Sequence, residues 1–109
     1  MRRRHRLRSS RDFARVRAAR RGAGDPLLRV QVRERADGEP RIGFAVSRKV
    51  GGAVVRNRAR RRLRALLDRE LPAMRPADVV VIPTAAAAGA PFLDLGAALH
   101  RVLARAGAL

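Results

Sequence analysis

The chain has 109 residues with no cysteine and no tryptophan, so we expect one domain that folds without disulfides, thiolate metal ligands or thiol catalysis. No apolar run approaches the roughly 20 residues that a membrane span needs, which favours a soluble, cytoplasmic protein. The formal net charge is +17, and residues 1–64 carry 22 of the 26 basic side chains against five of the nine acidic ones, which predicts a polyanionic partner.

Arginine supplies every basic side chain except Lys49. This bias is typical of a GC-rich genome. It equally suits phosphate binding, because the planar guanidinium donates hydrogen bonds in pairs and stacks on bases.

The N-terminal part of the chain predicts a basic arm followed by a helix. Residues 1–8 lack a hydrophobic period, and we expect them to be mobile. Ser9 or Ser10 can cap a helix that begins near Arg11, and Gly22 to Pro26 ends it. Phe13 and Val16 share one face of this helix, which predicts either a core contact or one wall of a cleft.

Two alternating runs follow, at residues 28–33 and 42–47. The Asp37-Gly38 pair between them predicts an antiparallel hairpin. In the second run one face carries only Gly43, Ala45 and Ser47, a shelf of small side chains on which another group can lie.

From Ala53 to Leu71 the hydrophobic period becomes helical. Arg62 falls inside the apolar sector, a defect in the pattern, and the inward residues are Val55, Ala59, Leu63, Leu66 and Leu67. The apolar run at 79–82 predicts a buried strand, residues 84–91 a small-residue linker, and residues 92–106 a last amphipathic helix with Leu95, Leu99, Val102 and Leu103 inward. The order α-β-β-α-β-α predicts an α+β fold with a small mixed sheet and three helices.

No arrangement of side chains predicts a protein active site. His5 and His100 are far apart in sequence, and the nine acidic residues show neither paired-carboxylate nor metal-ligand spacing. The exception is the basic helix, where six arginines lie between residues 56 and 64. They repel one another unless an anion binds, although a charge run is ordinarily a solvated face.

The segment Arg41-Ile-Gly-Phe-Ala-Val-Ser-Arg-Lys-Val-Gly-Gly-Ala-Val-Val-Arg-Asn-Arg58, with the basic helix after it, resembles the protein subunit of bacterial ribonuclease P. The Arg-Asn-Arg at 56–58 is the most specific part of the resemblance, which extends to Asp12-Phe13 and to residues 78–83. It implies an α/β sandwich with a left-handed βαβ crossover, which departs from the usual right-handed rule.

The resemblance also implies a cofactor protein of a ribozyme. Its partners would be a catalytic RNA that acts with Mg²⁺, bound one to one, and precursor tRNA, whose 5′ leader is removed; no metal is expected on the protein itself. The residues that match the surface facing the catalytic RNA are Arg56, Asn57, Arg58, Arg60, Arg61 and Arg64. Those that match the leader cleft are Phe13, Arg17, Ser47, Arg48 and Lys49.

Four positions depart from the family pattern: Arg17 and Val30 stand where aromatic residues are common, and Gly52 and Thr84 where polar or basic ones are. Composition alone fits two other kinds of protein equally well, a structural RNA-binding protein such as a small ribosomal protein and a nucleoid-type DNA-binding protein. Only the Arg-Asn-Arg context separates these alternatives from the ribonuclease P protein.

Overall fold

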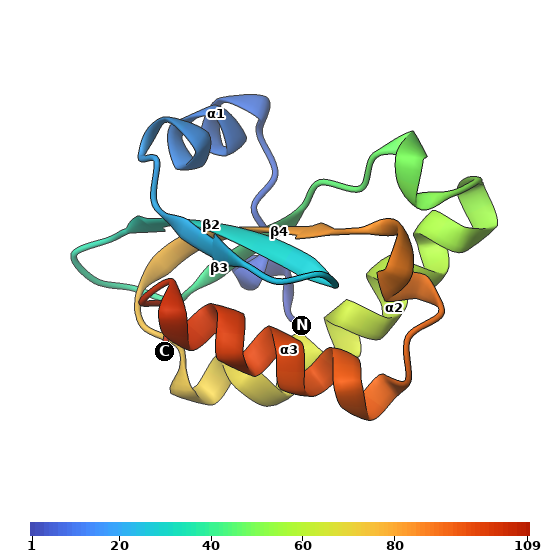
Figure 1. Cartoon of the computed structure of the whole chain (residues 1–109). Coiled ribbons are helices and arrows are strands. Elements are labelled where there is room, and N and C mark those ends of the chain that lie inside the picture. Colours follow the sequence, from blue (N-terminus) through green and yellow to red (C-terminus); the bar gives the residue numbers. More distant parts are fainter.

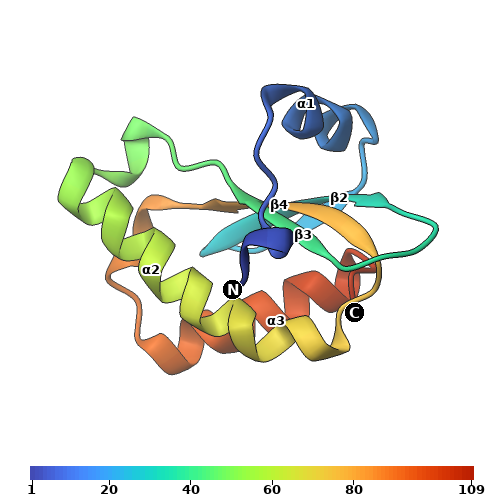
Figure 2. The same cartoon turned by 180° about the vertical axis from the view of Figure 1, so that it is seen from behind.

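The computed structural model describes residues 1–109 as a four-stranded sheet with one helix on one face and two on the other (Figures 1 and 2). Helix α1 lies above the sheet, and α2 and α3 lie side by side beneath it. The strands are β1 (Gly22–Gly24), β2 (Leu28–Glu34), β3 (Arg41–Phe44) and β4 (Ala77–Pro83), and the helices are α1 (Ser10–Ala18), α2 (Ala53–Glu70) and α3 (Phe92–Arg105). Short 3-10 turns occupy Arg3–His5, Arg48–Val50, Leu71–Ala73 and Ala85–Ala88.

The strand order is β1-β2-β4-β3, with β2 antiparallel and β3 parallel to β4. The predicted hairpin of residues 28–33 with 42–47 is therefore wrong, because β4 lies between the two runs. The apolar residues 79–81 are buried on both faces of the sheet, and only a central strand is covered in this way. A hairpin does form earlier in the chain, where β1 pairs with residues 29–31 of β2.

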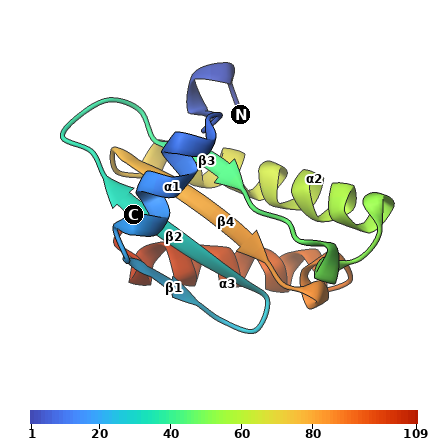
Figure 3. The same ribbon diagram turned by 90° about the horizontal axis from the view of Figure 1, so that it is seen from above.

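The connection from β3 through α2 to β4 is left-handed, as the resemblance implied. Seen from the α1 side, β3 and β4 point the same way while α2 passes beneath them (Figure 3). This handedness carries the basic helix past the outer edge of β3 rather than across the middle of the sheet.

The main core lies between the sheet and the two helices beneath it. Leu95, Leu99, Val102 and Leu103 of α3 are buried, as the helical period predicted, and so are Ala59, Leu63, Leu66 and Leu67 of α2. Val55 was predicted to point inward but is 38% exposed, because the first turns of α2 extend beyond the sheet. A smaller cluster on the α1 face joins Leu7, Val16 and Val80 to the half-buried Phe13.

Helix α1 begins where its cap predicted. The backbone N–H of Asp12 donates to the Ser9 hydroxyl at 3.1 Å, which satisfies one of the free donors of the first turn. The inner face carries the buried Val16 and the half-buried Phe13, so the helix packs on the sheet through the residues that the sequence indicated.

The N-terminal segment passes the outer edge of β3, where Arg6 pairs with Ile42 (Figure 2). The N–H of Leu7 donates to the carbonyl of Ile42 at 2.8 Å, and the Leu7 side chain is buried. The imidazole Nε2 of His5 lies 2.6 Å from Glu39 Oε2, and this hydrogen bond lowers the pKa of the Glu39 carboxyl. One apolar side chain and one histidine thus attach this segment to the sheet.

The structure explains why an arginine, Arg62, lies in the apolar sector of α2. Its guanidinium donates to the carbonyls of Ala87, Ala88 and Ala90, at the end of the 3-10 turn Ala85–Ala88. An arginine at this position thus serves as the polar cap of a small-residue segment that has no polar side chain of its own.

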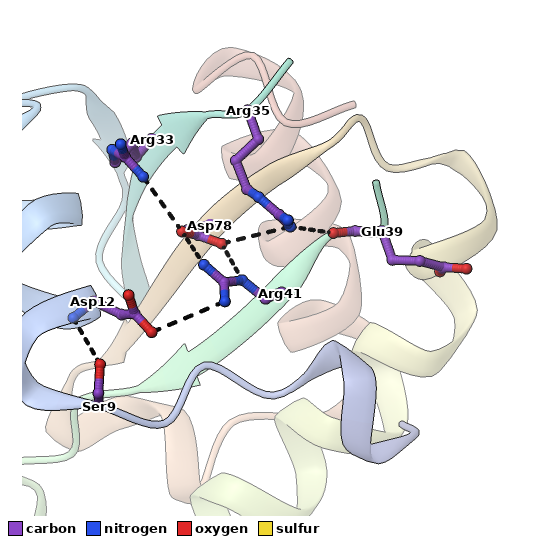
Figure 4. A network of polar contacts seen from close by, with 7 residues as sticks. All are labelled: Ser9, Asp12, Arg33, Arg35, Glu39, Arg41 and Asp78. Atoms are coloured by element: carbon purple, nitrogen blue, oxygen red, sulfur yellow. Dashed lines mark hydrogen bonds and ion pairs between the residues drawn. The ribbon is translucent and has the colours of Figure 1, made fainter. Parts of the chain in front are cut away.

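The buried carboxylate of Asp78 on β4 joins this strand to β2 and β3, and its partner Arg41 lies 3.9 Å from Asp12 of α1 (Figure 4). Asp78 on β4 is 1% exposed and accepts two hydrogen bonds from Arg41 on β3, at 2.7 and 2.8 Å. The hydrogen bonds to Asp78 raise the pKa of the Arg41 guanidinium. Arg33 and Arg35 approach Asp78 from the β2 side at 3.8 and 3.9 Å.

We predict that Asp78→Asn lowers the free energy of unfolding by about 3 kcal/mol, because it removes the negative charge that three arginines share. Urea denaturation followed by circular dichroism measures this loss. Asp37→Asn is the control, since Asp37 is exposed and pairs with no cation. Equal stability of the two variants would show that the pair does not hold the strands together.

Candidate nucleic-acid interface

The arginines of α2 have no carboxylate partner. Seven of the nine acidic side chains pair elsewhere, with arginines of other segments, with the two histidines or with the N-terminal amine. The six arginines between residues 56 and 64 are absent from these pairs. Their charge therefore stays uncompensated, which is the electrostatic condition for binding a polyanion.

The helix presents these arginines on both sides of its buried stripe. Arg60 and Arg64 face the edge of β3 and the N-terminal segment, whereas Arg58 and Arg61 face α3 together with Arg62. Asn57 and Arg61 are exposed on the outer side, and Arg56 is partly buried. The six residues predicted to face RNA thus form one surface that wraps around the helix.

A hollow of about 310 Å³ lies between α2, β3 and the N-terminal segment. The guanidinium of Arg64 stacks on the Phe44 ring at 5.8 Å from its centroid, and the Arg64 Nε is buried without a hydrogen-bond partner. The lining residues are Met1, Arg6, Leu7, Arg8, Phe13, Ile42, Gly43, Phe44, Arg60 and Arg64. Four arginines and two phenylalanines converge here, so the hollow combines anion donors with surfaces for stacking.

Phe13 occupies the shelf of small side chains that the sequence indicated. A Cβ added at Gly43 would overlap the Phe13 ring, so only glycine lets α1 approach β3 this closely. The ring is half-buried on the sheet and also lines the hollow, and it therefore serves both as core and as wall.

The other residues predicted for a leader cleft lie apart from Phe13. Arg17 lines a separate hollow of about 430 Å³ at the end of α1, with Arg20, Arg21 and Arg29. Ser47, Arg48 and Lys49 are exposed on the connection from β3 to α2. The structure thus brings Phe13 next to Arg60 and Arg64 and spreads the remaining predicted residues around the α1 face of the sheet.

Sequence reasoning missed several residues of these surfaces. Arg20 and Arg29 meet only because β1 and β2 form a hairpin, and the glycine-rich run 22–24 gave no strand signal. Phe44 and Arg64 meet through the β3–α2 connection, a contact with no local pattern in the sequence. The charge of residues 1–8 was the only indication that Arg6 and Arg8 belong here.

Three of the positions that depart from the family pattern have structural roles. Thr84 donates its hydroxyl to the carbonyl of Pro26 at 2.7 Å and so joins two loops. Val30 is buried in the main core beneath the sheet, and Gly52 is the exposed N-cap residue of α2. The fourth, Arg17, is the one that lies on a candidate binding surface.

No cluster of three or more His, Asp or Glu side chains is positioned to hold a metal ion. His100 is exposed beside Glu70 and His5 is bound to Glu39, so each histidine has a carboxylate partner on the scaffold. No helix has the length and apolar character for crossing a membrane. Arginines line three of the hollows, and their side chains are suited to binding an anion.

Comparison with known proteins identifies the relatives of this chain. The family model for Ribonuclease P matches residues 1–107. A ribonuclease P protein component of Gluconacetobacter diazotrophicus is 42% identical over 107 residues, covering 94% of this chain and 91% of its own, and one of Streptomyces bikiniensis is 43% identical, covering 91% and 92%. Among solved structures, a ribonuclease P protein from Thermotoga maritima shares 28% identity at a TM-score of 0.83, covering 92% of this chain and 96% of its own.

We predict that Gly43→Ala destabilises the protein by about 1–3 kcal/mol, because the added methyl group forces the Phe13 ring from the sheet. Thermal unfolding measures the effect. Gly89→Ala is the matched control, since a Cβ at Gly89 meets no atom within 4 Å and its φ is negative. If both variants unfold at the same temperature, the Phe13 ring does not rest against Gly43.

Proposed function

The chain belongs to the ribonuclease P protein family, as a protein subunit of ribonuclease P in tRNA processing, and we propose that α2 binds the catalytic RNA while the α1 side of the sheet binds the 5′ leader of precursor tRNA. The observation that supports this proposal best is the set of arginines on α2 that no carboxylate neutralises. A cytoplasmic location goes with it, because precursor tRNA is made there in bacteria.

The cleavage chemistry is assigned to the RNA and its Mg²⁺ ions. The protein offers a poor Mg²⁺ site, because that ion prefers carboxylate and other oxygen ligands in octahedral geometry and the carboxylates here are dispersed and mostly paired with cations. The contribution of the chain is then to hold two polyanions together, in a complex that we take to contain one copy of each subunit.

Arginine suits the proposed contacts with RNA. Arg60 and Arg64 reach the hollow beside Phe13 from the same helix that presents Arg58 and Arg61 on its other side. A strand bound near Phe13 would therefore lie close to RNA bound along α2. In this proposal, leader and catalytic RNA would bind on adjoining surfaces of the protein, on the two sides of α2.

We predict that the protein increases leader removal by the catalytic RNA subunit at low Mg²⁺ concentration, because it screens the repulsion between the two RNAs. The measurement is single-turnover cleavage of precursor tRNA with and without protein. The protein without the RNA should cleave nothing. Cleavage by RNA-free protein that persists through purification would contradict the proposed division of labour.

We predict that Arg58→Ala and Phe13→Leu weaken the binding of different RNAs. Arg58→Ala should weaken assembly with the catalytic RNA by about 1.5–3 kcal/mol at every leader length, since a hydrogen bond to a charged group is lost. Phe13→Leu keeps an apolar side chain against the sheet. It should weaken the binding of precursor tRNA by about 1–3 kcal/mol, and only when the leader is long enough to reach the hollow.

The control for Arg58→Ala is Arg105→Ala, which also removes an exposed arginine without a carboxylate partner, at the far end of α3. Filter binding with a series of leader lengths measures both effects. An affinity loss for Phe13→Leu that does not depend on the leader would place the leader elsewhere on the protein.

A further inference from the structure

Phe92, the first residue of α3, is the most exposed of the three phenylalanines, at 37%. It lies between two hollows. On one side are Arg58, Arg61 and Arg62 around a hollow of about 380 Å³, and on the other are Leu66, Leu93 and Ala97 around one of about 340 Å³. The ring is thus the shared wall of a basic depression and of a mainly apolar one that also has Arg69 and Glu70 in its lining.

Two arginines of α2 contact the Phe92 ring. The guanidinium carbons of Arg62 and Arg69 each lie 5.7 Å from the ring centroid, within range of a cation–π contact. Arg62 is itself fixed by its hydrogen bonds to the carbonyls of residues 87, 88 and 90. These hydrogen bonds fix the Arg62 guanidinium, and the Phe92 ring that it contacts is therefore held in place before any ligand binds.

The rim of this site selects a polyanion. Arg58, Arg61, Arg62 and Arg69 have no carboxylate within ion-pair distance. A second copy of the chain is disfavoured, since each copy carries a net charge of +17. A ligand that is both anionic and flat fits the arginines and the ring together, and an unpaired nucleotide has both properties.

We propose that Phe92 is a stacking platform for an unpaired base of RNA, with the adjoining phosphates on Arg58 and Arg61. This proposal rests on the proposed function, because it extends the RNA-binding surface of α2 onto α3. The base would lie against the exposed part of the ring, and its strand would follow the basic hollow along α2.

The test compares Phe92→Leu, Phe92→Tyr and Leu93→Ala with the unchanged protein in binding to the catalytic RNA subunit. Phe92→Leu removes the ring and keeps an apolar side chain, and Phe92→Tyr keeps the ring. We expect Phe92→Leu to bind roughly five- to a hundred-fold more weakly, the range for one stacked base, and Phe92→Tyr to bind normally. Leu93 is 84% exposed and has no ring, so Leu93→Ala should also bind normally.

A second arm uses an adenine oligonucleotide and an abasic strand with the same number of phosphates. The unchanged protein should favour the adenine strand, and Phe92→Leu should reduce that preference without changing binding to the abasic strand. Thermal unfolding of each variant is recorded, since a ring at the exposed start of a helix should contribute little to stability.

The salt dependence of binding separates this inference from the proposed function. If about six to eight phosphates are contacted, the slope of log affinity against log salt should be roughly −4 to −7, and it should be the same for Phe92→Leu, which carries no charge change. A slope near zero for the unchanged protein would overturn the proposed function. A normal slope with unaltered affinity for Phe92→Leu would overturn the stacking platform alone, and so would an equal loss for Leu93→Ala, which would indicate apolar docking of a protein partner.

Discussion

Asp78 and Arg41 are hydrogen-bonded partners and also face each other in the register of β4 and β3. The position of β3 along β4 is therefore tied to one buried ion pair, and β3 determines where α2 begins. If β3 moved by one residue, its side chains would change faces, and Gly43 would no longer lie beneath Phe13. The hollow beside α2 depends on this single register.

The acidic side chains and the arginines of α2 have different roles in the protein. The acidic side chains hold the scaffold together: Asp78 and Asp12 contact Arg41, Glu39 binds His5, and Asp25 accepts the backbone N–H groups of Leu27 and Leu28. Few carboxylates remain near α2. A chain with 26 basic residues can thus fold with ordinary ion pairs where strands meet and still leave one helix uncompensated.

Local patterns predicted the helices and the buried strand well. The Ser9 cap, the helical period from Ala53 to Leu71 and the apolar run at 79–82 each depend on neighbours in sequence, and each is confirmed in the structure, where the helix ends at Glu70. The strand order could not be predicted in this way. Two alternating runs on either side of an Asp-Gly pair are as compatible with a hairpin as with two strands that a third strand separates.

The candidate site shows the same limit. The excess charge of α2 was visible in the sequence, and so was the shelf at Gly43 that receives Phe13. The partners of Arg62 and the placing of Phe92 were not visible, since they depend on how residues 87–92 fold back onto α2. Arg62 looked like a defect in an apolar stripe because its carbonyl partners lie 25 to 28 positions further along the chain.

The N-terminal segment has a consequence for the behaviour of the protein before it meets RNA. An uncovered outer strand offers a row of free backbone groups to which other chains can add, the usual beginning of aggregation. Here residues 6 and 7 occupy that row on β3, and the opposite edge is the three-residue β1, with glycine at both ends. Newly made chains that have not yet bound a partner therefore expose few free backbone groups to which a strand of another chain could add.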